Sequence, residues 1–163
     1  MDDKEWQGIH SHKDSMTEEK RRSLQCKIYP LDTLKDYMFV VVCTNYDGKW
    51  VLSKHKERRT WETQGGHIEK GESAIDSARR ELFEESGITD AEIYPICDYL
   101  GYDKDGSANG VAFLAVARAL GALPESEMKE IRAFDVLPEE LTYPDVTPKL
   151  IEEANKILKK QRN

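Results

Sequence analysis

Residues 73–87 are the segment of this sequence with the most narrowly determined conformation. Ser73 suits the cap at the start of a helix, and Gly87 suits the left-handed residue that commonly ends one. At 3.6 residues per turn, three apolar side chains between these caps fall on one face: Ile75, Ala78 and Leu82. The segment therefore predicts an amphipathic helix whose apolar face packs on a sheet.

Apolar runs before and after this helix predict strands. Residues 37–45 are almost continuously apolar, as in a buried strand, and an Asp-Gly turn at residues 47–48 returns the chain along residues 49–55. Further strands are expected at residues 60–64, 91–103, 110–120 and 131–137, followed by an amphipathic helix at residues 147–161. This order predicts an α/β (α+β) domain, a sandwich with a mixed sheet.

The first 25 residues differ from the rest in pattern. Residues 1–25 are charged and lack sustained periodicity, which predicts a polar, loosely ordered N-terminal extension with a short helix near residues 15–25. Residues 26–163 contain no internal repeat or linker and are expected to form one domain.

Charge and cysteine content exclude several classes of protein. The 163 residues include 31 acidic and 24 basic side chains, a formal charge of −7, which disfavours binding to nucleic acid or to an anionic membrane. The sequence contains no apolar run of about eighteen residues, so no membrane span is predicted. The three cysteines are widely spaced, which argues against a disulfide framework or a zinc site and favours the cytoplasm.

One turn of the predicted helix carries three acidic side chains: Glu81, Glu84 and Glu85. Such a turn is either a solvated acidic face or a cation site. Only Arg80 lies at a helical spacing that can offset the repulsion among these carboxylates. Before the helix begins, Gly65 and Gly66 let the backbone approach a ligand closely. Carboxylate and carbonyl oxygens suit a hard cation such as Mg²⁺ or Mn²⁺. We therefore favour the cation site.

This stretch resembles the Nudix box, the motif Gly-x5-Glu-x7-Arg-Glu-apolar-x-Glu-Glu-x-Gly-apolar. Every defined position is matched, by Gly66, Glu72, Arg80, Glu81, Leu82, Glu84, Glu85, Gly87 and Ile88. The resemblance implies the α/β/α sandwich of that family and the Mg²⁺-dependent hydrolysis of a nucleoside diphosphate linked to another group. Gln64 stands where many members have proline, and we expect it to loosen the turn without removing a ligand.

The resemblance also implies a role for each residue of the motif. The implied metal ligands are Glu81 and Glu85, assisted by Glu84 and by a backbone carbonyl such as that of Gly65. Glu84 and Glu85 are accordingly implied in catalysis. The implied structural residues are Gly66, Glu72, Arg80 and Gly87, with an ion pair between Glu72 and Arg80.

A separate general base is expected, because a bound cation lowers the pKa of the carboxylates that hold it. Family members often supply this base from the loop before the last strand, where this chain has Glu125, Glu127 and Glu130. Glu127, in mid-loop, is the preferred candidate, and the alternative is that all three are solvated loop charges.

Five further residues are candidates for substrate contact. Arg58 and Arg59 precede the motif and either clamp substrate phosphates or mark an exposed hairpin end. Tyr102 is a candidate for the base pocket that strands of this family help to form, as are Tyr99 and Phe113, although aromatic residues in strands are more often core.

The substrate is chosen by elimination from partial motif matches. A nucleoside triphosphate, oxidised as in 8-oxo-dGTP or not, cleaved to the monophosphate and pyrophosphate, is the first expectation. The alternatives are an ADP-ribose or dinucleoside polyphosphate pyrophosphatase and a non-catalytic nucleotide-sensing module, against which the three intact helix glutamates argue. The expected partner is a small nucleotide, not nucleic acid or membrane, and the chain is expected to be a monomer or a homodimer.

Overall fold

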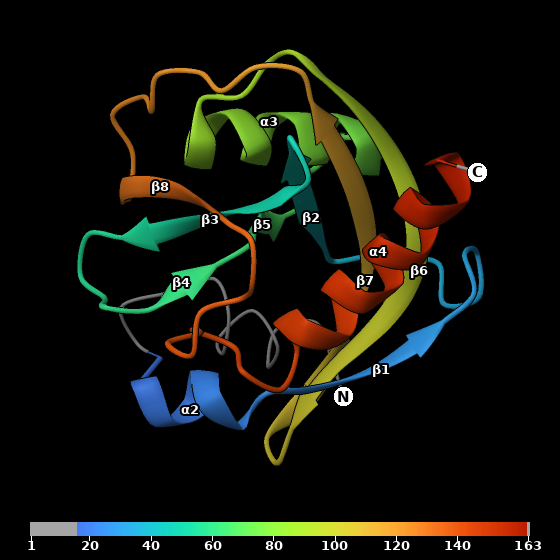
Figure 1. Ribbon diagram of the computed structural model, residues 1–163. Coiled ribbons are helices and arrows are strands. Elements are labelled where there is room, and N and C mark those ends of the chain that lie inside the picture. The colour runs from blue at the N-terminus through green and yellow to red at the C-terminus, as the bar shows by residue number, and fades with distance from the viewer. Residues whose placement is uncertain (1–15, 163) are drawn as a thin grey trace.

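The computed structural model describes residues 16–162 and shows helices on both sides of a curved sheet (Figure 1). In chain order its elements are α2 (Glu18–Ser23), β1 (Gln25–Tyr29), β2 (Phe39–Tyr46), β3 (Lys49–His55), β4 (Trp61–Glu62), β5 (Gln64–His67), α3 (Ala74–Ser86), β6 (Ala91–Asp103), β7 (Gly106–Ala117), β8 (Met128–Phe134) and α4 (Thr147–Arg162).

The strands form one mixed sheet in the order β1-β6-β7-β2-β3-β4, with β5 paired to β2 and β8 paired to β3. Strands β2 and β7 run parallel, and the other paired strands run antiparallel. One edge of β2 changes partner along its length: Phe39–Val42 pair with β5, and Thr44–Tyr46 pair with β3. This change brings the short strand β5 beside the first half of β2.

Helices α3 and α4 cover opposite faces of this sheet. Along β2, Val40 and Val42 pack with the apolar face of α3, whereas Val41 and Cys43 pack with α4. The nearly continuous apolar run predicted for this strand therefore serves two cores. The α/β/α sandwich with a mixed sheet is confirmed.

Helix α3 has the boundaries that its sequence predicts. The Ser73 hydroxyl accepts a hydrogen bond from the Asp76 backbone N–H, and Gly87 takes the left-handed conformation, with φ of 81°. Another side chain at residue 87 would also collide with the backbone at Ala122. These local signals fix the length of the helix and hence the positions of its glutamates.

Strand boundaries follow the predictions less closely. Strand β7 begins four residues before the expected position, and β8 begins three residues before it. Strands β1 and β5 have no counterpart among the strands expected from the sequence. Strand β5 contains two glycines and resembles a loop in sequence, and its pairing with β2 makes it a strand.

The described part of the N-terminal extension packs on the domain. Residues 1–15 lie outside the described residues, and the expected short helix is α2, capped by the Thr17 side chain. Met16 and Leu24 are buried in a cluster with Ala108. Lys20 also pairs with Asp105 in the turn between β6 and β7, with 2.6 Å between the charged atoms.

The described chain has no candidate membrane span and no disulfide bond. Among residues 16–162, no helix has the length and apolar composition needed to cross a bilayer. Cys26, Cys43 and Cys97 are buried free thiols.

Candidate active site

A cavity of about 630 Å³ lies where β2, β5, β6, α3 and the loop before β8 meet. One part of its wall, which we call the acidic wall, carries Glu81, Glu84, Glu85 and Glu127. Another part, which we call the aromatic end, carries Leu24, Phe39, Tyr99, Tyr143 and Val146. The cavity thus joins groups that can hold cations and phosphates to groups that can pack against a ring.

The acidic wall is built by packing α3 against the two glycines of β5. The Gly65 N–H donates a hydrogen bond to Oε1 of Glu85 at 2.8 Å. A Cβ at Gly66 would lie 2.5 Å from Oε1 of Glu81, so only glycine leaves room for that carboxylate. Glu81 and Glu85 are 8% and 5% exposed, whereas half of the Glu84 side chain is exposed.

Arg80 connects the acidic wall to the loop before the helix. Its guanidinium donates two hydrogen bonds to Glu72, at 2.8 and 3.0 Å, and one to Glu81 at 2.8 Å. It also donates to the His67 carbonyl at 3.1 Å and approaches Glu84 at 3.4 Å. The hydrogen bond from Arg80 lowers the pKa of Glu72 to about 2. The contact between Arg80 and Glu72 matches the ion pair that the motif implied.

Gln64 differs from what its sequence position suggested. Instead of loosening a turn, it is fully buried in β5. Its amide oxygen accepts from the Thr44 hydroxyl at 2.6 Å, and its amide nitrogen donates to the Ser53 hydroxyl at 2.9 Å and the Val51 carbonyl at 3.2 Å. Ser53 in turn donates to the Glu85 carbonyl at 2.8 Å. Gln64 therefore helps to hold the end of α3 against the sheet.

The loop before β8 brings Glu127 to the cavity beside the α3 glutamates. The Lys56 N–H donates to the Glu127 carbonyl at 2.8 Å, which anchors the loop. Nε2 of the buried His55 lies 3.8 Å from Oε2 of Glu127, while Nδ1 accepts from the Glu57 N–H. Since Nδ1 is an acceptor, Nε2 carries a proton on the side that faces Glu127. The pairing of β3 with β8 shifts register between Lys54 and His55, as at a β-bulge.

The two other glutamates proposed from this loop have different surroundings. Glu125 also lines the cavity, but it pairs with Lys56 at 2.7 Å and its side chain is almost fully exposed. Glu130 does not line the cavity and pairs with Arg132 at 2.8 Å.

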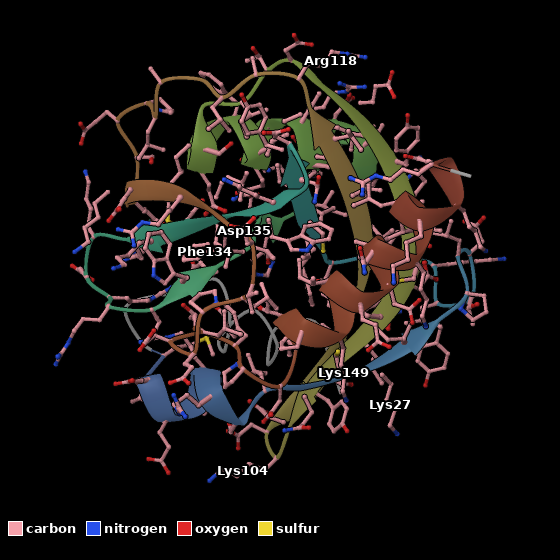
Figure 2. All side chains as sticks on the ribbon, viewed as in Figure 1. Lys27, Lys104, Arg118, Phe134, Asp135 and Lys149 are labelled. Carbon is pink, nitrogen blue, oxygen red and sulfur yellow. The ribbon has the colours of Figure 1, made fainter. Side chains whose placement is uncertain are left out.

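The structure does not bring Arg58, Arg59 or Tyr102 to the cavity. Arg58 forms a buried pair with Glu62 at 2.9 Å, and Arg59 is exposed. Tyr102 lies on the face of β6 opposite to Tyr99, because side chains alternate along a strand. Its ring contacts Lys27, whose side chain extends outward from β1 (Figure 2). These three residues are therefore poorly placed for the roles expected from the sequence.

The acidic wall has a suitable donor set for a hard cation, although its carboxylates do not converge on one point. Within residues 16–162, no three His, Cys, Asp or Glu side chains are arranged to hold a metal ion together. Glu81 instead contacts Arg80, and Glu85 contacts Gly65. The donors are nevertheless all oxygens, two of the carboxylates are buried, and Gly66 leaves space beside one of them. This chemistry fits Mg²⁺ or Mn²⁺.

A family model described as the NUDIX domain matches residues 35–160. The chain belongs to the Nudix family. Its complete motif marks it as an enzyme of that family, a pyrophosphohydrolase. No curated protein sequence matches the chain significantly.

Several solved Nudix structures have a similar fold. The Bacillus subtilis pyrophosphohydrolase BsRppH is similar with a TM-score of 0.70 and 22% identity, over 82% of this chain and 90% of that one. The NUDIX domain of Shewanella oneidensis NrtR, complexed with ADP ribose, has a TM-score of 0.61 and 20% identity, over 80% and 94%. A MutT NUDIX hydrolase from Burkholderia pseudomallei has a TM-score of 0.56 and 24% identity, over 71% of this chain and 95% of that one. At these identities the likeness establishes the fold.

Sequence reasoning missed several residues of this site. Leu24 and Gln25 line the cavity although they belong to the expected polar extension and precede the family match. Glu62 also lines it, beside its partner Arg58. No local pattern marks these residues, since strand pairing and loop packing bring them to the cavity.

Proposed function

We propose that this Nudix enzyme hydrolyses a nucleoside triphosphate, oxidised or not, to the monophosphate and pyrophosphate with Mg²⁺ or Mn²⁺. The observation that carries this proposal is the single cavity that joins the acidic wall to an aromatic end. A polyphosphate placed along the wall leaves its nucleoside at the aromatic end, within reach of rings that can pack against a base.

Nudix hydrolases generally use a divalent metal ion. Glu81, Glu85 and Glu84, with a carbonyl of β5 such as that of Gly65, would hold it. When bound, the ion supplies positive charge that neutralises the phosphate oxygens and polarises the attacking water. Arg80 keeps the loop and the first turns of α3 together, so that the carboxylates stay on one wall.

In this proposal Glu127 accepts the proton of the attacking water. It comes from a different element than the α3 glutamates and contacts His55. Water forms a bond to one phosphorus of the anhydride, the bond from that phosphorus to the bridging oxygen breaks, and the bridging oxygen leaves with the other phosphate group. The proton passes to the Glu127 carboxylate.

A nucleotide panel tests this function. Each nucleoside triphosphate, 8-oxo-dGTP, ADP-ribose and a dinucleoside tetraphosphate are incubated with Mg²⁺, and chromatography separates monophosphate, pyrophosphate and orthophosphate. We expect monophosphate and pyrophosphate from a triphosphate, and a loss in kcat of about 10²-fold or more in Glu85→Gln. Orthophosphate as the sole inorganic product, or preferred cleavage of ADP-ribose or the dinucleotide, would overturn the triphosphate assignment. A loss of less than about threefold in Glu85→Gln would remove Glu85 from the principal ligands.

A further inference from the structure

His55 is a buried histidine at the end of β3, beside the residue proposed as the general base. Its side chain is 7% exposed. Near this end of the strand, Ser53 and His55 are buried while Lys54 between them is partly exposed, as expected where side chains alternate between two faces. Because the Ser53 hydroxyl donates to the Glu85 carbonyl, His55 lies on the face of β3 that is turned toward the end of α3.

The histidine ring is held in one orientation and in one tautomer. Nδ1 accepts a hydrogen bond from the Glu57 backbone N–H at 3.1 Å, so the proton of the neutral ring is on Nε2. Nε2 lies 3.8 Å from Oε2 of Glu127. This distance is longer than a hydrogen bond, but hydrogen bonds between catalytic groups are often long in the free enzyme and shorten when substrate binds. A fixed N–H donor thus faces the Glu127 carboxylate.

The register shift between β3 and β8 brings Glu127 next to this donor. His55 pairs with Met128, and Lys129 is the extra residue on β8. Regular pairing would place Lys129 opposite His55 and would move Glu127 one position farther away. The Lys56 N–H then donates to the Glu127 carbonyl at 2.8 Å, which holds the backbone of Glu127 against β3.

The side chain of Glu127 is less restrained than its backbone. It is 60% exposed and lines the cavity together with the α3 glutamates, whose negative charge repels it. Lys56 does not offset this repulsion, because its ammonium pairs with Glu125 at 2.7 Å. His55 therefore presents a donor to Glu127 from a buried position on the sheet, where its own ring cannot move freely.

We propose that His55 is the positioning residue of the general base: its Nε2–H keeps the Glu127 carboxylate directed at the attacking water. His55 does not line the cavity, so it acts through Glu127 and not on the substrate. A base is efficient only when it lies within hydrogen-bond reach of the proton that it accepts, and a third group that orients it raises kcat. This inference rests on the proposed function, in which Glu127 accepts the proton of water.

Nuclear magnetic resonance of the histidine nitrogens tests the contact without substrate. The chain has four histidines, and the signals of His55 are those that disappear in His55→Gln. We expect the neutral tautomer with the proton on Nε2, and a displaced Nε2 resonance in Glu127→Gln. Glu125→Gln is the matched control, because Glu125 is on the same loop but pairs with Lys56, and it should leave that resonance in place. A proton on Nδ1, an undisplaced resonance in Glu127→Gln or an equal displacement in both variants would overturn the proposal.

Two substitutions at His55 separate the roles of its two ring nitrogens. His55→Gln keeps an N–H donor at about the reach of Nε2, whereas His55→Asn keeps an acceptor near Nδ1 for the Glu57 N–H and loses the distal donor. The substrate is the nucleoside triphosphate that the wild type cleaves fastest. Compared with the wild type, kcat should be about tenfold lower in His55→Asn and within about threefold in His55→Gln, with KM unchanged in both. The reverse order of kcat, or a raised KM at full kcat, would overturn the proposal.

A double variant tests whether His55 acts through Glu127. In the Glu127→Gln background, His55→Asn should lower kcat no further, because the group that it positions is already absent. A further loss of about tenfold would show a separate, structural effect and overturn the proposal, as would wild-type kcat in Glu127→Gln alone. Failure of the proposed hydrolysis is distinguishable, since it appears as an absence of cleavage by the wild type. The resonance experiment still decides in that case whether His55 faces Glu127.

Discussion

At the scale of single residues, Arg80 is the main positive group beside the glutamates of the acidic wall. It donates to Glu72 and Glu81, and only about a quarter of its side chain is exposed. Arg80→Ala should lower the free energy of unfolding by about 2 kcal/mol, since it leaves two poorly exposed carboxylates without this partner. For a chain of this size the melting temperature should fall by roughly 4–8 °C. An unchanged melting temperature with activity lost would instead make Arg80 a direct catalytic group.

The pair between Arg80 and Glu72 also predicts a pH dependence of stability. The hydrogen bond from Arg80 lowers the pKa of Glu72 from 4.5 to about 2, so the folded state favours the ionised carboxylate. This stabilisation is fully present above about pH 4.5 and is lost as the pH falls to about 2. Urea unfolding of the wild type and Glu72→Gln should therefore differ at pH 7 and converge between pH 4.5 and 2. A difference that is constant over this range would contradict the assignment.

Glu127 is the residue whose substitution best tests the general base. Glu127→Gln should reduce kcat by about 10²-fold, because the amide cannot accept the proton of water. Metal affinity should change little, since Glu127 lies on a different element than the α3 glutamates. Kinetics of Glu125→Gln provide a matched control, because Glu125 lines the same cavity but pairs with Lys56. Wild-type kcat in Glu127→Gln with a large loss in Glu125→Gln or Glu130→Gln would reassign the role.

At the scale of elements, Gln64 couples β5 to the strands beside it and to the end of α3. Its buried amide contacts Thr44 and Ser53, and Ser53 contacts the Glu85 carbonyl. Gln64→Leu leaves these buried hydroxyls without their partner, which should cost about 1–3 kcal/mol of stability and roughly 3–10 °C in melting temperature. Calorimetric unfolding measures this. An equally stable Gln64→Leu would show that Thr44 and Ser53 find other partners.

The elements differ in how well their sequences predict them. Helix α3 was predicted with its exact caps because Ser73, Gly87 and the apolar spacing act within the segment itself. Strand β5 was missed because its residues, Gln64–His67, have low strand propensity and become a strand only by pairing with β2. Strand β1 was missed because it forms by pairing with β6, which lies about seventy residues later in the chain.

At the scale of the whole molecule, the acidic wall could be predicted from the sequence, because one segment supplies most of it. The motif places Glu81, Glu84 and Glu85 on a single helix, and all three line the cavity. Leu24 and Tyr143 reach the same cavity from opposite ends of the chain, and no local pattern records that meeting. Arg58 and Tyr102 do not line the cavity, and the sequence gives no sign of this. Closeness in sequence to the motif does not tell which partner an arginine takes or which face of a strand a tyrosine occupies.

Metal binding should stabilise the entire domain, because an ion that binds the folded state preferentially shifts the unfolding equilibrium. The acidic wall brings the carboxylates of Glu81 and Glu85 into a largely buried position, and positive charge placed there relieves their repulsion. With Mg²⁺ at about one hundred times its Kd, the gain is about 2.7 kcal/mol, or roughly 5–10 °C in melting temperature.

Thermal unfolding with Mg²⁺, with Mn²⁺ and with excess chelator measures this gain without any substrate. Glu81→Gln should lose most of the increase in melting temperature. Glu152→Gln, which removes an exposed acidic side chain of α4 outside the cavity, should keep it. Hydrolysis should stop in chelator and return with added Mg²⁺, because the positive charge of the ion neutralises the phosphate oxygens of the substrate. An equal increase in both variants would show that Mg²⁺ acts on the general surface charge, and full hydrolysis in chelator would exclude the metal site on α3.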